Sequence, residues 1–141
     1  MKVLICPDSF KGTFSASEVS TLIAQGVTKT DPRIQTDLVP LADGGEGTLE
    51  ALNYLVTQYH TEISSPLGKH DKVPARFGIM TNEPTTAIIE TSQAIGLHLI
   101  PEGKRNPLYT TTYGVGELIK AALEKNCRKI IIGIGGSSTN D

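Results

Sequence analysis

Residues 2–8 read KVLICPD, an apolar and β-branched run that ends at Pro7 and Asp8 and predicts a buried strand. After it, Ser15 and Glu18 have the spacing of a capping box, which predicts the start of a helix. Residues 34–41 predict a second strand, interrupted near its end by a proline. The apolar residues of the helix between the two strands share one face: Val19, Leu22, Ile23 and Val27.

Residues 43–47 read DGGEG and follow the second strand, with three glycines in five residues. So much backbone freedom predicts a loop. Another helix is expected to open near Thr48. The order strand, helix, strand, helix indicates an α/β layer with a parallel sheet. The residues of this second helix predicted to face the core are Leu49, Leu52, Leu55, Val56 and Tyr59.

The middle of the chain has a different pattern. Residues 61–65, 72–80 and 85–90 predict short strands with turns and no helix between them. Such an order indicates an antiparallel or mixed sheet, so a domain change is expected near Pro66. Two domains are therefore predicted, over residues 1–66 and 67–141.

The last third of the chain predicts a loop over residues 97–106, then a helix over 113–125 with Thr112 as its N-cap. A buried strand over 129–134 then leads into GGSSTND, residues 135–141. A glycine-rich turn after a strand normally feeds a helix, and none follows. We therefore expect the sequence to be a fragment of a longer protein.

Composition narrows the class of protein. The 141 residues are 38% hydrophobic and 20% charged with a formal net charge of -2, which is a soluble globular balance. Nucleic-acid and membrane-surface binders need a basic face, so neither class is expected. The apolar N-terminus is too short for a signal peptide, which predicts a cytoplasmic protein. Cys6 and Cys127 lack metal-ligand spacing and are expected to be buried reduced thiols.

Three polar, glycine-bearing segments follow predicted strands: residues 8–12, 43–47 and 135–141. Ligands of open α/β sheets bind beyond the carboxyl ends of strands, and glycine amides, a lysine and carboxylates suit phosphate chemistry. Gly and Asp also simply fill turns. No Walker motif is present, and the run from Gly133 lacks the last glycine of a dinucleotide fingerprint. Arg105 and the threonines at 110–112 form either an anion site or a plain helix cap.

Together these motifs closely resemble the type I glycerate kinase family. The resemblance rests on residues 7–12, 42–48, 105–107 with 110–117, and 132–141, which occur here in one order. It implies a kinase of D-glycerate that depends on ATP and Mg²⁺. It also implies two α/β domains, one Rossmann-like and one inserted into it. Family members are more than twice as long as this chain.

Under this resemblance, Lys11 would neutralise the charge of a phosphate or of the substrate carboxylate. Asp8 and Asp43 would orient the hydroxyl or the metal. Asp141 is the expected metal ligand, and a homo-oligomer is possible. The residues expected to bind substrate or phosphate are Ser9, Gly44, Gly45, Glu46, Arg105, Gly135, Gly136 and Ser137.

Two alternatives stay open beside the kinase. The first is a non-catalytic α/β module that binds an anion or nucleotide without turnover, which truncation favours. The second is a nicotinamide oxidoreductase, against which the incomplete fingerprint argues.

Overall fold

The computed structural model describes residues 1–141. The chain forms two compact units, Met1–Asp43 and Gly44–Asp141, and each is described by itself.

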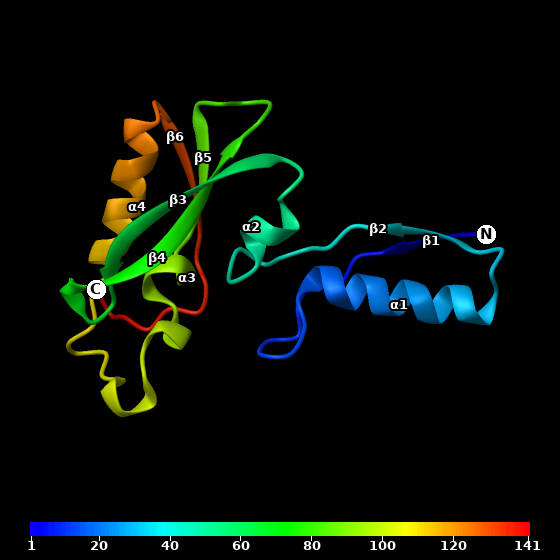
Figure 1. The fold of residues 1–141 in the computed structure, drawn as a ribbon, viewed down its shortest axis with the longest axis horizontal. Coiled ribbons are helices and arrows are strands. Elements are labelled where there is room, and N and C mark those ends of the chain that lie inside the picture. The colour runs from blue at the N-terminus through cyan, green and yellow to red at the C-terminus, as the bar shows by residue number, and fades with distance from the viewer. The chain divides into compact units, whose positions relative to one another are not determined.

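The first unit is a strand–helix–strand motif. Strands β1 (Lys2–Ile5) and β2 (Gln35–Leu38) pair in parallel, and helix α1 (Ala16–Thr30) connects them (Figure 1). The capping box is confirmed: Glu18 N–H donates to Ser15 Oγ at 3.3 Å, and Ser15 N–H donates to Glu18 Oε2 at 2.8 Å.

Burial in this unit is less than the sequence predicts. Val19 is buried, but Leu22 is 51% exposed and Ile23 is 43% exposed. Leu4 of β1 is 64% exposed, so this strand is not buried along its length. Within the unit, a sheet of only two strands offers one helix too little surface to cover its whole apolar face.

The second unit is built on a mixed sheet. Its strands are β3 (Val56–Ser65), β4 (Gly68–Met80), β5 (Thr86–Glu90) and β6 (Lys129–Gly133), in the order β3-β4-β5-β6. The first three are antiparallel and β6 is parallel to β5, which confirms the predicted mixed sheet.

Helix α4 (Tyr113–Glu124) matches the predicted helix and packs against the sheet (Figure 1). Two single-turn helices, α2 (Thr48–Ala51) and α3 (Ser92–Ile95), precede β3 and follow β5. The predicted loop contains two short 3-10 turns, Leu97–Leu99 and Glu102–Lys104.

The long second helix predicted from Thr48 is wrong. Only four residues are helical, and Val56 and Tyr59 belong to β3. Residues 56–65 form a strand because they pair with β4, in a register that runs from Val56 opposite Met80 to Ser65 opposite Gly68. Tyr59 also stacks on Phe77 of β4, with ring centroids 5.6 Å apart. The whole of β3 therefore lies in the second compact unit, Gly44–Asp141.

Strand β5 lies between two apolar layers. Its five residues are all buried. Ile89 packs with Leu118 and Ala122 of α4, whereas Ile88 packs with Leu49 and Val56 in a second cluster. This alternation follows from the two-residue period of a strand.

Strand β6 is the edge of the sheet, and the prediction that it is buried is wrong: Ile131 is 43% exposed and Ile132 is 39% exposed.

Both cysteines are free. Cys127 is buried as predicted, but Cys6 is exposed.

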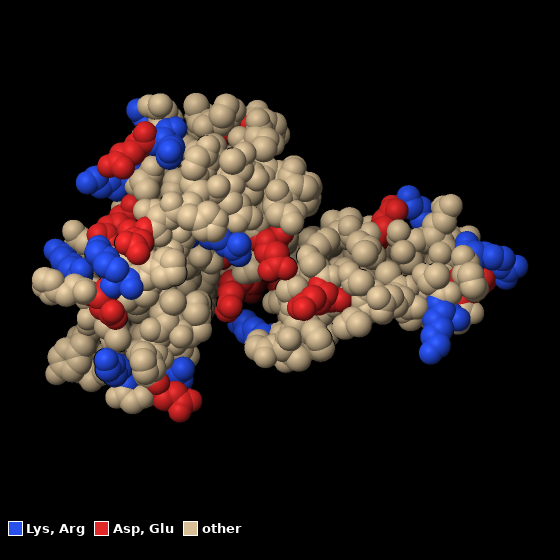
Figure 2. Space-filling model, viewed as in Figure 1, with Lys and Arg blue, Asp and Glu red and all other residues tan.

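Charge is mixed over the surface. On the face drawn in Figure 2, Lys and Arg side chains of each unit lie among Asp and Glu side chains. The described helices include none with the length and apolar character needed to cross a membrane.

Candidate functional site

Two glycine-rich loops touch within the second unit, and we call them the paired glycine loops: residues 44–47 and 133–136. A β-carbon on Gly133 would lie 2.2 Å from the carbonyl oxygen of Gly44. A β-carbon on Gly135 would lie 2.7 Å from Cα of Gly45. No side chain fits in either place, so the contact requires glycine.

Backbone conformation adds a second reason for glycine in these loops. Gly44, Gly47 and Gly136 have φ angles of 95°, 94° and 65°. Residues with a β-carbon rarely adopt this left-handed region. In the first loop, Thr48 closes the turn by donating from Oγ1 to the carbonyl of Gly45 at 2.9 Å. The backbones of both loops are thus held in close contact and in conformations that glycine adopts readily.

Glu90 and Thr91, at the end of β5, bind the start of α2, which follows the first loop, and the second loop itself. The Glu90 carboxylate is fully buried and accepts hydrogen bonds from Leu49 N–H at 2.5 Å and from Gln93 Nε2 at 3.0 Å. Thr91 N–H donates to the carbonyl of Gly133 at 3.0 Å, and Gly135 N–H donates to Thr91 Oγ1 at 3.4 Å. Sequence reasoning missed both roles. The available signal was a glutamate that ends an otherwise apolar strand.

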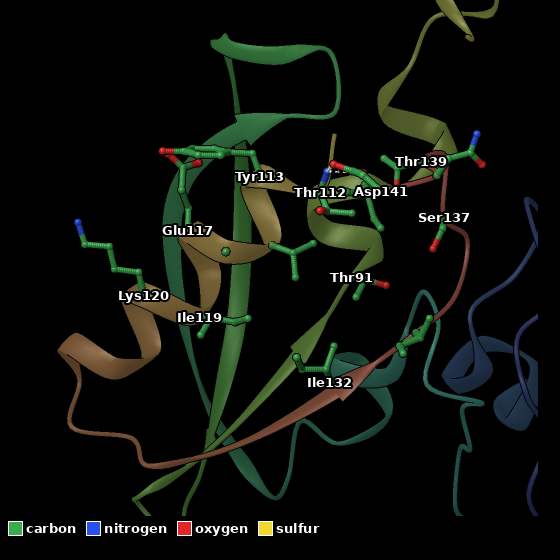
Figure 3. Close-up of a pocket in the computed structure, with 15 residues that line it drawn as sticks. Thr91, Thr112, Tyr113, Glu117, Ile119, Lys120, Ile132, Ser137, Thr139 and Asp141 are labelled. Atoms are coloured by element: carbon green, nitrogen blue, oxygen red, sulfur yellow. Dashed lines mark hydrogen bonds between the residues drawn. The ribbon is translucent and has the colours of Figure 1, made fainter. Parts of the chain in front are cut away.

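A cavity of about 910 Å³ lies between α4, β6 and the C-terminal segment (Figure 3). Its polar side chains include Thr91, Thr112, Ser137 and Asp141. Its apolar wall includes Ile119 and Ile132. The cavity therefore combines oxygen atoms and an apolar surface.

Asp141 lies at the N-terminus of α4. Its carboxylate accepts from Thr112 N–H at 3.0 Å and from Thr111 Oγ1 at 3.1 Å (Figure 3). The hydrogen bond from the Thr112 amide is the main cause that holds the pKa of Asp141 below its ordinary value. Thr112 occupies the N-cap position as predicted, but its side chain makes no capping hydrogen bond, and Asp141 supplies the acceptor instead.

The first unit carries the three side chains predicted to be catalytic: Asp8, Lys11 and Asp43. Asp8 Oδ1 accepts from Ser9 N–H at 2.6 Å. Lys11 is exposed in a turn that joins Phe10 to Phe14, where the backbone of Gly12 is left-handed with φ 73°. Asp43 is the last residue of this unit and is exposed.

The remaining predicted residues are spread over the second unit. Glu46 is exposed in the first glycine loop. Arg105 is exposed and donates from Nε to the carbonyl of Ile100 at 3.2 Å. Neither residue lines the cavity, whereas Ser137 and Asp141 do. Among the predicted residues, Gly44 and Gly45 lie against the second glycine loop, which contains Gly135 and Gly136.

The described residues could bind Mg²⁺ through a single carboxylate together with phosphate and water, and not through a cluster of protein ligands. The structure contains no group of three or more His, Cys, Asp or Glu side chains arranged to hold a metal. Mg²⁺ usually binds through one or two carboxylates together with substrate phosphates and water. Asp141 fits that role, because a carboxylate that accepts from Thr111 and Thr112 keeps further lone pairs.

Comparison with known proteins gives consistent matches along the whole chain. A model of the glycerate kinase family matches residues 3–141. A glycerate kinase of Haemophilus influenzae is 49% identical over 144 residues, which cover 100% of this chain and 37% of that protein. A glycerate 2-kinase of Escherichia coli K12 is 49% identical over 143 residues, with the same coverage.

A solved structure matches as well. The crystal structure of a candidate glycerate kinase 2 from Salmonella typhimurium LT2 has a TM-score of 0.78 and 45% identity. The match covers 100% of this chain and 37% of that one. The chain thus spans 37% of the length of these relatives.

Proposed function

The chain belongs to the glycerate kinase family, and from that premise we propose that it takes part in the ATP-dependent phosphorylation of D-glycerate. The observation that carries the proposal is the family match over residues 3–141, which includes both paired glycine loops. Glycine loops suit phosphate oxygens, because a backbone without side chains lets N–H groups approach an oxyanion closely.

Each proposed ligand has residues that suit it. The paired glycine loops would bind the phosphates of ATP, with Ser137 nearby in the sequence. The apolar wall at Ile119 and Ile132 suits a nucleoside base. Asp141 would hold Mg²⁺, which when bound offsets the charge on the phosphates.

The reaction would be an in-line transfer. A glycerate hydroxyl oxygen forms a bond to the γ-phosphorus of ATP, the bond from that phosphorus to the bridging oxygen breaks, and ADP leaves. The hydroxyl proton passes to a carboxylate, for which Asp8 and Asp43 are the candidates. Lys11 would offset the negative charge of the phosphates or of the substrate. The E. coli relative is named a 2-kinase, so we propose the 2-hydroxyl as the acceptor.

The test is a coupled assay of ADP release with Mg·ATP and D-glycerate, followed by identification of the phosphoglycerate isomer. The proposal expects ADP release that depends on D-glycerate and yields 2-phosphoglycerate. Release of ADP at the same rate without D-glycerate would contradict the proposed acceptor. Formation of 3-phosphoglycerate would contradict the proposed position only.

A second candidate is binding of Mg·ATP without turnover. The observation that favours it is that the chain spans 37% of the length of its relatives. Isothermal titration with Mg·ATP, run beside the coupled assay, separates the two. Heat of binding with no ADP release would support this second candidate.

A further inference from the structure

We propose that Glu90 and Thr91 are positioning residues that set the geometry of the paired glycine loops for phosphate binding. This inference rests on the proposed function of those loops. Glu90 and Thr91 are consecutive residues. Glu90 accepts from the amide of Leu49 in α2, two residues after the first loop, and Thr91 accepts from the amide of Gly135 in the second loop. These two neighbouring residues therefore bind two backbone segments that are distant from each other in the sequence.

The contact of Glu90 replaces a cap that the local sequence lacks. Helix α2 has Gly47 at its N-cap, and no side chain there accepts a hydrogen bond. The first amides of a helix need acceptors from elsewhere. The Glu90 carboxylate supplies one to Leu49, 41 positions away in the sequence. The downstream end of the first glycine loop is thereby tied to the end of β5.

The contacts of Thr91 fix the second loop. Its amide donates to the carbonyl of Gly133, and its hydroxyl accepts from the amide of Gly135. The side chain of Thr91 makes no cap for α3, so its hydroxyl serves the glycine loop instead. Gly133 and Gly135 are also the residues whose backbones touch the first loop.

Burial of a charge argues for a positioning role over a purely stabilising one. A fully buried carboxylate carries a desolvation penalty that can exceed what its hydrogen bonds return. Stability alone gives little reason for a glutamate at this position. A strand end that fixes the backbone next to both loops does give a reason, because ligand sites need preorganised groups.

The experiment uses the ¹⁵N-labelled chain and four forms: wild type, Glu90→Gln, Thr91→Val and the control Glu83→Gln. Glu83 is an exposed carboxylate that pairs with Lys129 at 3.5 Å and touches neither loop. Amide exchange is measured at Leu49, Gly44, Gly45 and Gly135. Mg·ATP affinity is measured by titration, and thermal unfolding is recorded for each form.

Glu90→Gln keeps the shape and an acceptor oxygen but loses the charge. We expect at least tenfold faster exchange at Leu49, faster exchange at Gly44 and Gly45, and at least fivefold weaker binding of Mg·ATP. We expect Thr91→Val to speed exchange at Gly135 and weaken binding similarly. Glu83→Gln should match wild type in every measurement.

Unchanged loop exchange and unchanged Mg·ATP affinity in both variants would overturn the positioning role, whatever happens to the melting temperature. If Glu90→Gln does not fold, the exchange at Gly135 in Thr91→Val decides. If wild type does not bind Mg·ATP, the proposed function fails, and the exchange measurements alone decide whether Glu90 and Thr91 order the loops.

Discussion

Gly133 and Gly44 touch through their backbones, so closely that a β-carbon on Gly133 would stand 2.2 Å from the carbonyl oxygen of Gly44. Gly44 follows the first unit directly, and Gly133 ends β6. This contact joins two loops that are distant in the sequence. Because the obstructing atom is backbone, it cannot rotate away as a side chain can.

Gly133→Ala should destabilise the second unit by about 1–3 kcal/mol, since overpacking forces a backbone shift. Thermal unfolding followed by circular dichroism measures the change. Gly116→Ala is the matched control, because no atom lies within 4 Å of its added β-carbon and it sits within α4. Alanine is the better helix former by about 1 kcal/mol, so this control should gain stability. Equal effects of the two substitutions would contradict the close contact.

The second prediction concerns Glu117 of α4 and its dependence on pH. Its carboxylate accepts from Ser64 N–H at 2.5 Å and from Lys72 Nζ at 3.1 Å. Burial alone raises the pKa of Glu117, but these two hydrogen bonds outweigh burial and hold the pKa below the ordinary 4.5. A lowered folded pKa means that the contribution to stability is present above pH 4.5 and is lost as pH falls through the folded value.

Glu117→Gln should therefore lower the free energy of unfolding by about 1–2 kcal/mol at pH 7, and the difference from wild type should shrink below the ordinary pKa. Denaturant titrations at pH 7 and near pH 3 measure it. Glu124→Gln on the same helix is the control, because Glu124 makes only an exposed pair with Lys120 at 3.9 Å. A difference that grows as pH falls would contradict the assigned sign.

The third prediction concerns self-association at the β6 edge. Ile134 is 77% exposed just after this edge strand, beside the half-exposed Ile132. An open edge with apolar side chains is a template for pairing with another chain. Ile134→Lys should lower the tendency to associate, measured by light scattering against protein concentration. Leu108→Lys, at a position that is 80% exposed but lies outside any strand, should change little.

Local signals in the sequence were enough for much of the fold. Ser15 and Glu18 predicted the start of α1, and the periodic apolar residues predicted α4. The helix predicted through Tyr59 failed because Val56 and Tyr59, which share its apolar spacing, belong to strand β3. Only pairing with β4 decides between a helix and a strand, and pairing is not a local property.

The sequence indicated where the glycine loops lie, but it did not indicate the hydrogen bonds that hold the neighbouring backbone. Glycines after predicted strands indicated both paired glycine loops. Their contact was not predictable in the same way, because β2 and β6, which precede them, belong to different sheets. The hydrogen bond from Leu49 to Glu90 spans 41 positions, so no local pattern reveals it. Likewise, Asp141 accepts from Thr112 across 29 positions and replaces the cap expected from Thr112 itself.

The last prediction tests Asp43, the residue directly before Gly44 in the paired glycine loops. Asparagine has nearly the same shape as aspartate and accepts hydrogen bonds about as well at a helix or turn, so a structural role would survive Asp43→Asn. A role in orienting the attacking hydroxyl or in holding Mg²⁺ would not, because both depend on the charge of the carboxylate.

We therefore expect Asp43→Asn in the full-length enzyme to leave the melting temperature within a few degrees while turnover falls about a hundredfold or more. ADP release with Mg·ATP and D-glycerate measures the turnover, and circular dichroism measures the melting. Glu46 is an exposed carboxylate in the adjacent first glycine loop. Glu46→Gln tests whether the loss of any negative charge near Asp43 has this effect. Wild-type turnover in Asp43→Asn would remove Asp43 from the proposed chemistry, and an equal loss in both variants would assign the effect to the charge of the loop.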